Sequence, residues 1–386
     1  MTGPQDPPDA VPEPAPDEPP PPLEASTGPG PAEPEAPQPE VAGPPPPSVQ
    51  STRRLIGASF DLLGRVSDPM RGASFYVGGI VLGTVGPFAL ASLALEVFSL
   101  HRTRREYDAL LGSGTGAAFG LLGFVAALGL LVAAVESRTM ATAILGGAYA
   151  DRPIDVRQAL ARSRMVFWRA IIAAVIVSIP VTFATNVVDS VLERAIGASG
   201  ELSLVAAVIV AALVGAPLAY LLTGIVLGDV DPAEATRRSF RVFRARKLAA
   251  ALVAVFESLA ILLVVLGLGA GLDIALRIFD AIGIGTESGP AGLALLAIGL
   301  VVGVFAFGTL IFTALAISLA PQVVMFVGLT RATVGLDHVR PGRDHDPLVT
   351  RPVGRRPFRW LPIPMCLGMA AGVVGLFGLL VALQAS

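Results

Sequence analysis

Long, nearly uninterrupted apolar blocks constrain this chain more than any other feature of its 386 residues. A helix needs about 20 consecutive apolar residues to cross the hydrocarbon part of a bilayer, and several blocks reach that length. Hydrophobic residues make up 53% of the chain and charged residues only 15%, whereas a soluble protein carries roughly a quarter charged residues. We therefore predict an all-α, polytopic transmembrane helix bundle with about seven spans. The predicted spans are 74–98, 116–138, 170–191, 203–227, 249–271, 292–327 and 363–384.

The first 50 residues have the opposite composition. They contain nine acidic residues, no Lys or Arg, and 19 of the 33 prolines of the chain. A segment with so few apolar side chains cannot bury enough surface to offset its chain entropy. We predict a disordered, proline-rich, acidic tail over residues 1–52. Two interpretations stay open: a docking tail for a protein partner that binds proline-rich segments, or a solvated spacer.

The distribution of arginine along the connections predicts the orientation of the chain, because cytoplasmic connections carry an excess of Lys and Arg. The connections after the second, fourth and sixth predicted spans are rich in Arg. Those after the third and fifth contain one Arg each, and the segment after the seventh contains none. The N-terminus is therefore predicted to be cytoplasmic and the C-terminus external. The connection after the first span disagrees, because it contains Arg102, Arg104 and Arg105.

Two of the basic connections repeat each other. Residues 159–167 and 235–243 are identical at five of nine positions, and they share Ala, Ser, Val and Phe in the same order and spacing. The spacing places these four side chains on one face of a helix and arginines on another, which is typical of a basic amphipathic helix in the membrane interface. A fainter copy with Leu55, Ser59 and Leu62 precedes the first span. We predict three repeats of an interfacial helix followed by two spans, plus one extra C-terminal span.

The arginines of these repeated segments are the candidate contacts with anionic lipid or with a cytosolic partner. An arginine close to an anionic leaflet contributes about 1 kcal/mol of attraction. The alternative is that the helices only fix topology and the ends of the spans. Asp231 and Pro232 predict where the second of these helices begins, as its N-cap and its first residue. The candidate contact residues are Arg162, Arg164, Arg169, Arg237, Arg238, Arg241 and Arg244.

These features divide the chain into four parts. They are the tail at 1–52, a helical membrane domain with internal repeats at 53–340, a basic cytoplasmic loop at 341–362 and an additional C-terminal transmembrane helix at 363–386. Glycines four residues apart, such as Gly116 and Gly120 or Gly299 and Gly303, predict close packing between helices inside the bundle.

A short pattern suggests a family. The segment Asp231–Lys247 contains a proline, then Ala-x-x-Arg-Ser, then basic and aromatic residues that lead into a span, and Pro153–Arg169 is a looser copy. This pattern resembles an uncharacterised bacterial multi-pass membrane family related to the membrane domain of glycerophosphoryl diester phosphodiesterases. Thr330–Asp337 is similar to a second family motif but lacks its glutamate. The resemblance covers 53–340, implies a bacterial cell membrane and carries over no catalytic residue.

No motif predicts a catalytic site, a cofactor or a metal ion, and no nucleic-acid partner is expected. The charges inside the spans are more informative. Glu257 lies near the middle of the fifth predicted span, where a charge costs about 2.5–3.5 kcal/mol to insert. Its side chain is therefore expected to face the bundle interior, either protonated or paired. Glu136 and Arg138 are expected at the cytoplasmic end of the second span.

Two hypotheses for function follow from this sequence. The first is a non-enzymatic membrane protein that organises or assembles membrane components, or that binds lipid or a partner through its basic interfacial helices. The alternative is a transporter or channel that uses the intramembrane Glu257.

Overall fold

The computed structural model describes residues 51–101, 114–196, 201–281 and 289–334. All of them belong to one of the two units into which the chain divides, Val41–Ser386. The predicted tail up to residue 50, the loop at 341–362 and the span at 363–386 lie outside the described residues.

Every regular element in the described residues is helical, which confirms the all-α prediction. Apolar residues fill the long helices, three of which contain an internal proline (Pro87, Pro180 and Pro321). The elements are α1 (Thr52–Arg65), α2 (Ser67–His101), α4 (Gly114–Tyr149), α5 (Val156–Ile196), α6 (Glu201–Gly215), the 3-10 helix η2 (Ala216–Leu218), α7 (Leu221–Gly228), α8 (Pro232–Ala245), α9 (Lys247–Ala281) and α10 (Gly289–Val334).

Six stretches are long and apolar enough to cross a membrane by length and composition. They correspond to the first six predicted spans, and together they identify the chain as a multi-pass helical membrane protein. The predicted end of the second span at residue 138 is wrong, because α4 continues to Tyr149. The six stretches are Ser67–Leu93, Phe119–Tyr149, Val156–Arg194, Leu204–Gly228, Lys247–Val264 and Ala294–Ala332.

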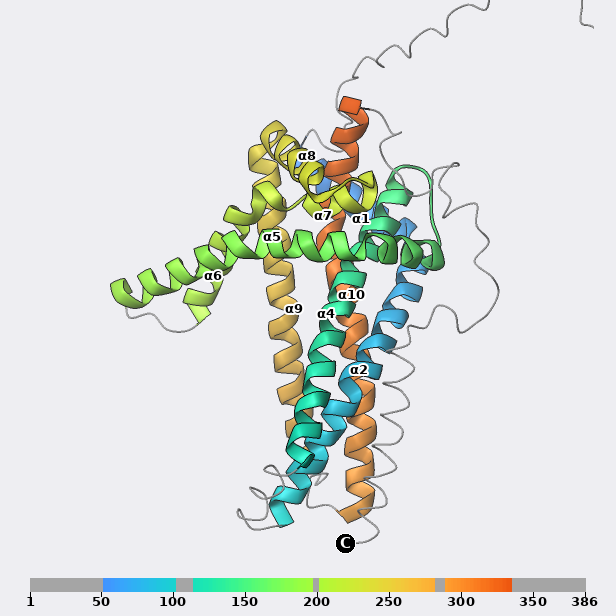
Figure 1. The fold of residues 1–386 in the computed structure, drawn as a ribbon, viewed down its shortest axis with the longest axis vertical. Coiled ribbons are helices and arrows are strands. Elements are labelled where there is room, and N and C mark those ends of the chain that lie inside the picture. The colour runs from blue at the N-terminus through green and yellow to red at the C-terminus, as the bar shows by residue number, and fades with distance from the viewer. Residues whose placement is uncertain (1–50, 102–113, 197–200, 282–288, 335–386) are drawn as a thin grey trace, which may run out of the picture. The chain divides into compact units, whose positions relative to one another are not determined.

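The core of the bundle lies where α2, α4 and α10 pack on one another, with α9 against α10. Figure 1 shows these four helices running in similar directions. Ile80 of α2, Ile144 of α4 and Phe312 of α10 are all buried in a single apolar cluster. These helices are apolar on most sides, so no single apolar face determines which helices become neighbours. The neighbours are instead determined by how closely the helix surfaces fit together.

Two helix backbones approach each other closely where α2 meets α10. A Cβ atom added to Gly308 would lie 2.8 Å from the Cα atom of Gly78 and 2.9 Å from the Cβ atom of Val81. Glycine is needed here because any side chain would push the two backbones apart. Two of the glycines for which the spacing predicted close packing, Gly120 and Gly303, are not at close helix contacts. A Cβ atom added at either position would meet no atom within 4 Å.

The helices α5 and α6 leave the direction of the other spans. Figure 1 shows α5 crossing α4 and α9, and the α5–α6 hairpin extending to one side. A row of large apolar side chains along α5 is exposed, as expected for a surface that faces lipid. The row is Ile172, Val175, Ile179, Phe183, Val187 and Val191. The predicted interfacial helix of the second repeat is continuous with this span, whereas α1 and α8 are separated from the next span by one residue.

The Gly78–Gly308 contact predicts a specific stability effect. We expect Gly308→Ala to lower the free energy of unfolding by about 1–3 kcal/mol, because the added methyl group overpacks a backbone contact. Gly303→Ala is the matched control: it makes the same change on the same helix, in open space, and should not destabilise. Unfolding of the purified protein in detergent measures both. Equal stability of the two variants would contradict this account of the contact.

Candidate functional site

The three repeated amphipathic helices begin in the same way. In each, an N-cap side chain accepts a hydrogen bond from the backbone N–H three residues further on. The donor–acceptor distances are 3.4 Å for Ser51, 2.7 Å for Asp155 and 3.0 Å for Asp231. Asp155 and Gln158 form a capping box. In addition to the bond that the Asp155 carboxylate accepts, the backbone N–H of Asp155 donates to the side-chain oxygen of Gln158 at 3.0 Å. Asp231 is the N-cap that the sequence predicted.

Each helix then buries the same stripe. The residues 4, 8 and 11 positions after the N-cap are buried in all three copies, which is the spacing of one helix face. The repeat predicted from the sequence is therefore also present in the packing. The stripes are Leu55, Ser59 and Leu62 in α1, Ala159, Ser163 and Val166 in α5, and Ala235, Ser239 and Val242 in α8.

The central serine of the stripe has a different partner in each copy. Ser59 donates to the Leu55 carbonyl of its own helix at 2.7 Å, and Ser163 pairs with the hydroxyl of Thr139 in α4. Ser239 donates to the carbonyl of Pro217 at 2.6 Å and accepts from the N–H of Tyr220 at 3.2 Å.

Ser239 thereby satisfies the backbone at the interruption of the fourth span. Pro217 lies in η2, between α6 and α7, where the regular helix is broken. Inside a membrane a freed backbone group needs a partner from the protein, since hydrocarbon offers none. The α8 helix is therefore fixed to the broken span by a buried hydroxyl as well as by its apolar stripe.

Two of the predicted contact arginines bind within the protein. Arg162 is buried, donates from Nε to the Val226 carbonyl at 2.9 Å and lies 3.4 Å from the Asp229 carboxylate. Arg169 donates to the Asp229 carboxylate at 2.9 Å and to the Val230 carbonyl at 3.2 Å. Asp229 itself has a left-handed backbone with φ of 51° at the end of α7. The two arginines thus hold α5 to the α7–α8 turn.

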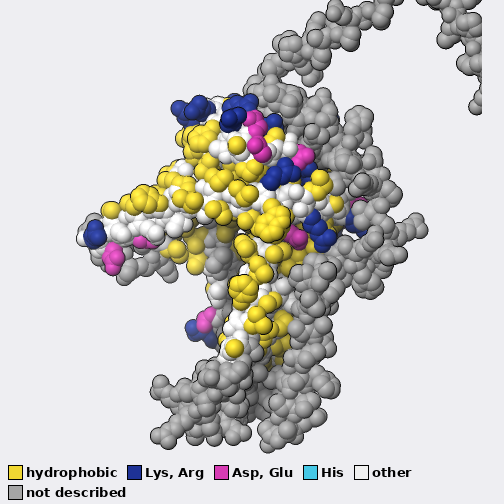
Figure 2. All heavy atoms as spheres, in the orientation of Figure 1, with side chains coloured by type: hydrophobic (Ala, Val, Ile, Leu, Met, Phe, Trp, Pro, Cys, Tyr) yellow, Lys and Arg dark blue, Asp and Glu magenta, His cyan; other side chains and the backbone are white. Residues whose placement is uncertain are grey.

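The remaining predicted arginines lie on or near the outside. Arg164 is exposed and lies close enough to Glu136 for an electrostatic interaction. Arg237, Arg238 and Arg241 surround the single carboxylate of Glu234, at 3.7, 3.2 and 2.9 Å. The side chains of Arg237 and Arg241 are 77% and 65% exposed, and Arg244 is also exposed. Figure 2 shows Lys and Arg side chains gathered at the end where α8 lies.

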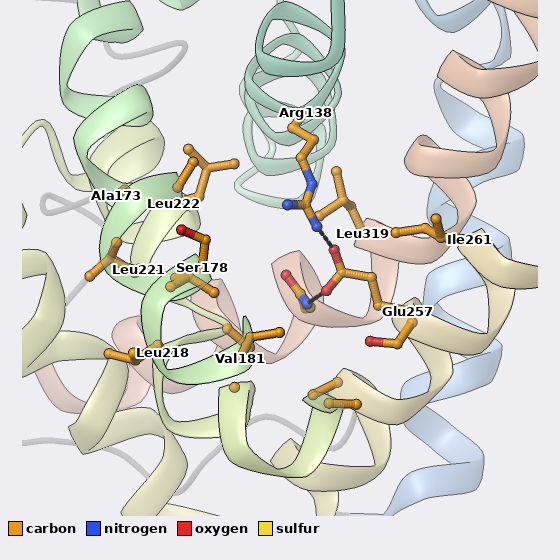
Figure 3. Close-up of a pocket in the computed structure, with 18 of the residues that line it drawn as sticks. Arg138, Ala173, Ser178, Val181, Leu218, Leu221, Leu222, Glu257, Ile261 and Leu319 are labelled. Atoms are coloured by element: carbon orange, nitrogen blue, oxygen red, sulfur yellow. Dashed lines mark hydrogen bonds and ion pairs between the residues drawn. The ribbon is translucent and has the colours of Figure 1, made fainter. Parts of the chain in front are cut away.

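Glu257 joins three helices. It is buried in α9, forms an ion pair with Arg138 of α4 and accepts a hydrogen bond from the side-chain amide of Gln322 in α10 (Figure 3). Arg138 does not lie at the end of α4, since the helix continues for eleven residues beyond it. Residues 139–149 continue the helix and include the fully buried Met140 and Ile144.

A cavity of about 420 Å³ lies beside this ion pair, and we call it the Glu257 cavity. Its wall comes from α4, α5, α9, α10 and the broken span α6–η2–α7, and most of it is apolar. Figure 3 shows Arg138, Glu257 and Ser178 around the same space. The polar side chains in the wall are Arg138, Ser178, Glu257, Ser258 and Gln322.

The sequence pointed to Glu257 but not to its partners. Arg138 carries the opposite charge and lies within an apolar run, and these two features could have identified it as the partner of Glu257. Gln322 follows Pro321 inside the sixth span and gave no comparable signal. Within the described ranges, no group of three or more His, Cys, Asp or Glu side chains is placed to hold a metal ion.

The hydrogen bonds of Ser239 predict the cost of losing them. We expect Ser239→Ala to lower the free energy of unfolding by about 1–3 kcal/mol, because it leaves buried backbone groups at Pro217 and Tyr220 without a partner. Ser59→Ala is the control, since Ser59 is equally buried but bonds only within its own helix. Thermal unfolding in detergent compares the two variants. A larger loss for Ser59→Ala would contradict the assignment.

Comparison of the chain with models of protein families, with curated proteins and with solved structures finds no match in any of the three. The resemblance to the bacterial family with a phosphodiesterase-associated membrane domain therefore stays a prediction from its short motifs.

Proposed function

We propose that this chain is a non-enzymatic integral membrane protein that binds anionic lipid and organises the leaflet on which its basic helices lie. One observation carries the proposal. The helix α8 buries its stripe against the protein and keeps Arg237, Arg241 and Arg244 outside, directly before a span. The arginines of α8 are thereby held on the outer side of a helix whose orientation is fixed.

The position of α8 along the chain supports contact with headgroups. The helix ends at Ala245 and the next candidate span begins at Lys247, so Arg244 lies within one turn of the start of that candidate span. Attraction between an arginine and an anionic leaflet is about 1 kcal/mol and falls off over roughly 8 Å. Phe240, which is partly exposed beside these arginines, adds an apolar contact of the kind that interfacial helices make.

The local ion pairs do not cancel the charge of this face. Arg237, Arg238 and Arg241 share the single carboxylate of Glu234, and Arg244 lies a turn beyond them. A net positive charge therefore remains on α8. This excess supports binding of anionic lipid over the alternative that the helix only fixes topology, because topology needs the charge but not its fixed placement on one outward face.

The proposal predicts a charge-dependent effect of lipid on stability. Addition of phosphatidylglycerol to the purified full chain in neutral detergent should raise its melting temperature, because lipid that binds the folded state stabilises it. In R237Q/R241Q/R244Q the apparent affinity for phosphatidylglycerol should fall on the order of tenfold or more. The charge-retaining R237K/R241K/R244K variant is the control and should keep most of the effect. Equal lipid responses in the two triple variants would contradict the proposal.

A second candidate function has its own observation. The Glu257 cavity combines a buried ion pair with a wall that includes a broken span, and binding sites of transporters are built at broken spans near intramembrane charges. In this alternative the Glu257 carboxylate would take part in proton-coupled movement of a small, mostly apolar substrate. The complete pairing of Glu257 with Arg138 and Gln322 favours a structural role over this one.

Proton flux separates these two roles of Glu257. In proteoliposomes loaded with a pH-sensitive dye, we expect the wild-type chain to acidify no faster than empty vesicles after an acid pulse. A faster influx that is lost in Glu257→Gln and kept in Ser258→Ala would favour the transporter. Ser258 is the control because it lines the same cavity without joining the ion pair.

A further inference from the structure

We infer that a groove between α1, α9 and α10 is a binding site for one anionic phospholipid molecule, with its phosphate at Arg246 and Lys247 and one acyl chain along α9. We call this the α1 groove. It is made of two cavities that share Thr52 and Leu55. Two cations and two hydroxyls line one of them together with apolar residues, and the other is lined mostly by apolar side chains. The inference rests on the proposed function, to which it adds a defined binding site, the α1 groove, for a single anionic phospholipid.

The polar end of the α1 groove has the chemistry of a phosphate site. Its polar side chains are Ser51 and Thr52 at the start of α1, Arg246 between α8 and α9, and Lys247 at the start of α9. The rest of the wall of this cavity of about 290 Å³ is apolar: Leu55, Leu248, Ala249 and Met325. Lys247 is exposed, and within the part of the chain that the structure describes it has no ion-pair partner. The first N–H groups of α9 add to the positive potential of the two cationic side chains.

The other end of the α1 groove has the chemistry of an acyl-chain site. This cavity of about 250 Å³ lies between the apolar face of α1 and the side chains of α9 and α10. Several large apolar side chains in its wall are exposed in the protein alone, including Phe60 at 62%, Ile56 at 48% and Phe256 at 44%. An acyl chain in the groove would pack against this surface through van der Waals contacts, which are the interactions that drive apolar association inside hydrocarbon.

The length and level of the groove match one leaflet. Lys247 and Phe256 are nine residues apart on α9, which is about 14 Å of helix and close to half of the roughly 30 Å hydrocarbon thickness. The candidate span begins at Lys247, so the cations lie where headgroups lie and Phe256 lies at the depth of acyl chains. An acidic peptide suits the polar end alone, whereas a phospholipid suits both ends.

The experiment uses a tryptophan probe in the apolar end of the groove. The full chain carries F256W together with W168F and W360F, which removes both natural tryptophans. It is reconstituted in phosphatidylcholine bilayers that contain either phosphatidylglycerol or phosphatidylcholine with brominated chains, which quench a nearby indole. We expect brominated phosphatidylglycerol to quench at a several-fold lower mole fraction, at roughly fivefold per cation. Equal quenching by the two lipids would overturn the inference.

Two charge variants in the F256W background locate the preference. K247Q should reduce the preference for phosphatidylglycerol several-fold, and R246Q/K247Q should remove it. K247Q is the variant on which the inference depends, because Lys247 is exposed and its loss should leave folding intact. The R237Q/R241Q/R244Q variant should leave the preference at the F256W probe in place. A preference that is lost in the α8 variant and kept in K247Q would overturn the inference and leave the proposed function standing.

The acidic segment 1–50 is the competing occupant of the polar end, since it precedes Ser51 and carries nine acidic residues and no basic ones. Deletion of residues 1–50 tests it. An unchanged preference for phosphatidylglycerol in the full chain and in the deletion variant supports the lipid. A preference that is absent from the full chain and present only after deletion would assign the polar end to the acidic segment and overturn the inference.

Discussion

The absence of water in the hydrocarbon requires that each polar group inside a span finds its partner in the protein, and the described structure depends on that constraint. The broken span at Pro217 persists because Ser239 of α8 binds both sides of the interruption. The carboxylate of Glu257 is tolerated in α9 because Arg138 and Gln322 reach it from two other helices. In both places a polar contact also decides which helices are neighbours, so the same interactions that remove an energetic cost specify the packing.

The threefold repeat could be predicted from sequence because its signal is local. The spacing of Leu55 and Ser59 and of their counterparts places side chains on one face of a helix in any context, so burial of that stripe needs no knowledge of the rest. The N-cap at Asp231 is local for the same reason. Six spans and the all-α class follow from apolar length alone.

What could not be predicted depends on contacts between distant segments. Glu136 and Arg138 look like the end of a span when only neighbours in sequence are considered. Arg138 instead lies inside α4, and its counter-charge is Glu257 of α9, which is distant in sequence. Burial of Arg162 against the end of α7 has no local signal, since an arginine in an amphipathic helix is usually solvated. The close glycine contact between Gly78 and Gly308 joins two helices that are far apart in the chain, and glycine is too frequent here for spacing to identify it.

The uninterrupted course of α5 links two regions mechanically. Between Val156 and the residue before Pro180 the helix has no break, and this rigid length carries Arg162 and Arg169 near one end and the cavity-lining Ser178 near the other. A change in the tilt of this segment would also displace Arg162 and Arg169. One unbroken helix segment therefore contributes both to the wall of the Glu257 cavity and to the contacts with Asp229, so a molecule that displaced this part of the wall would also act on those contacts.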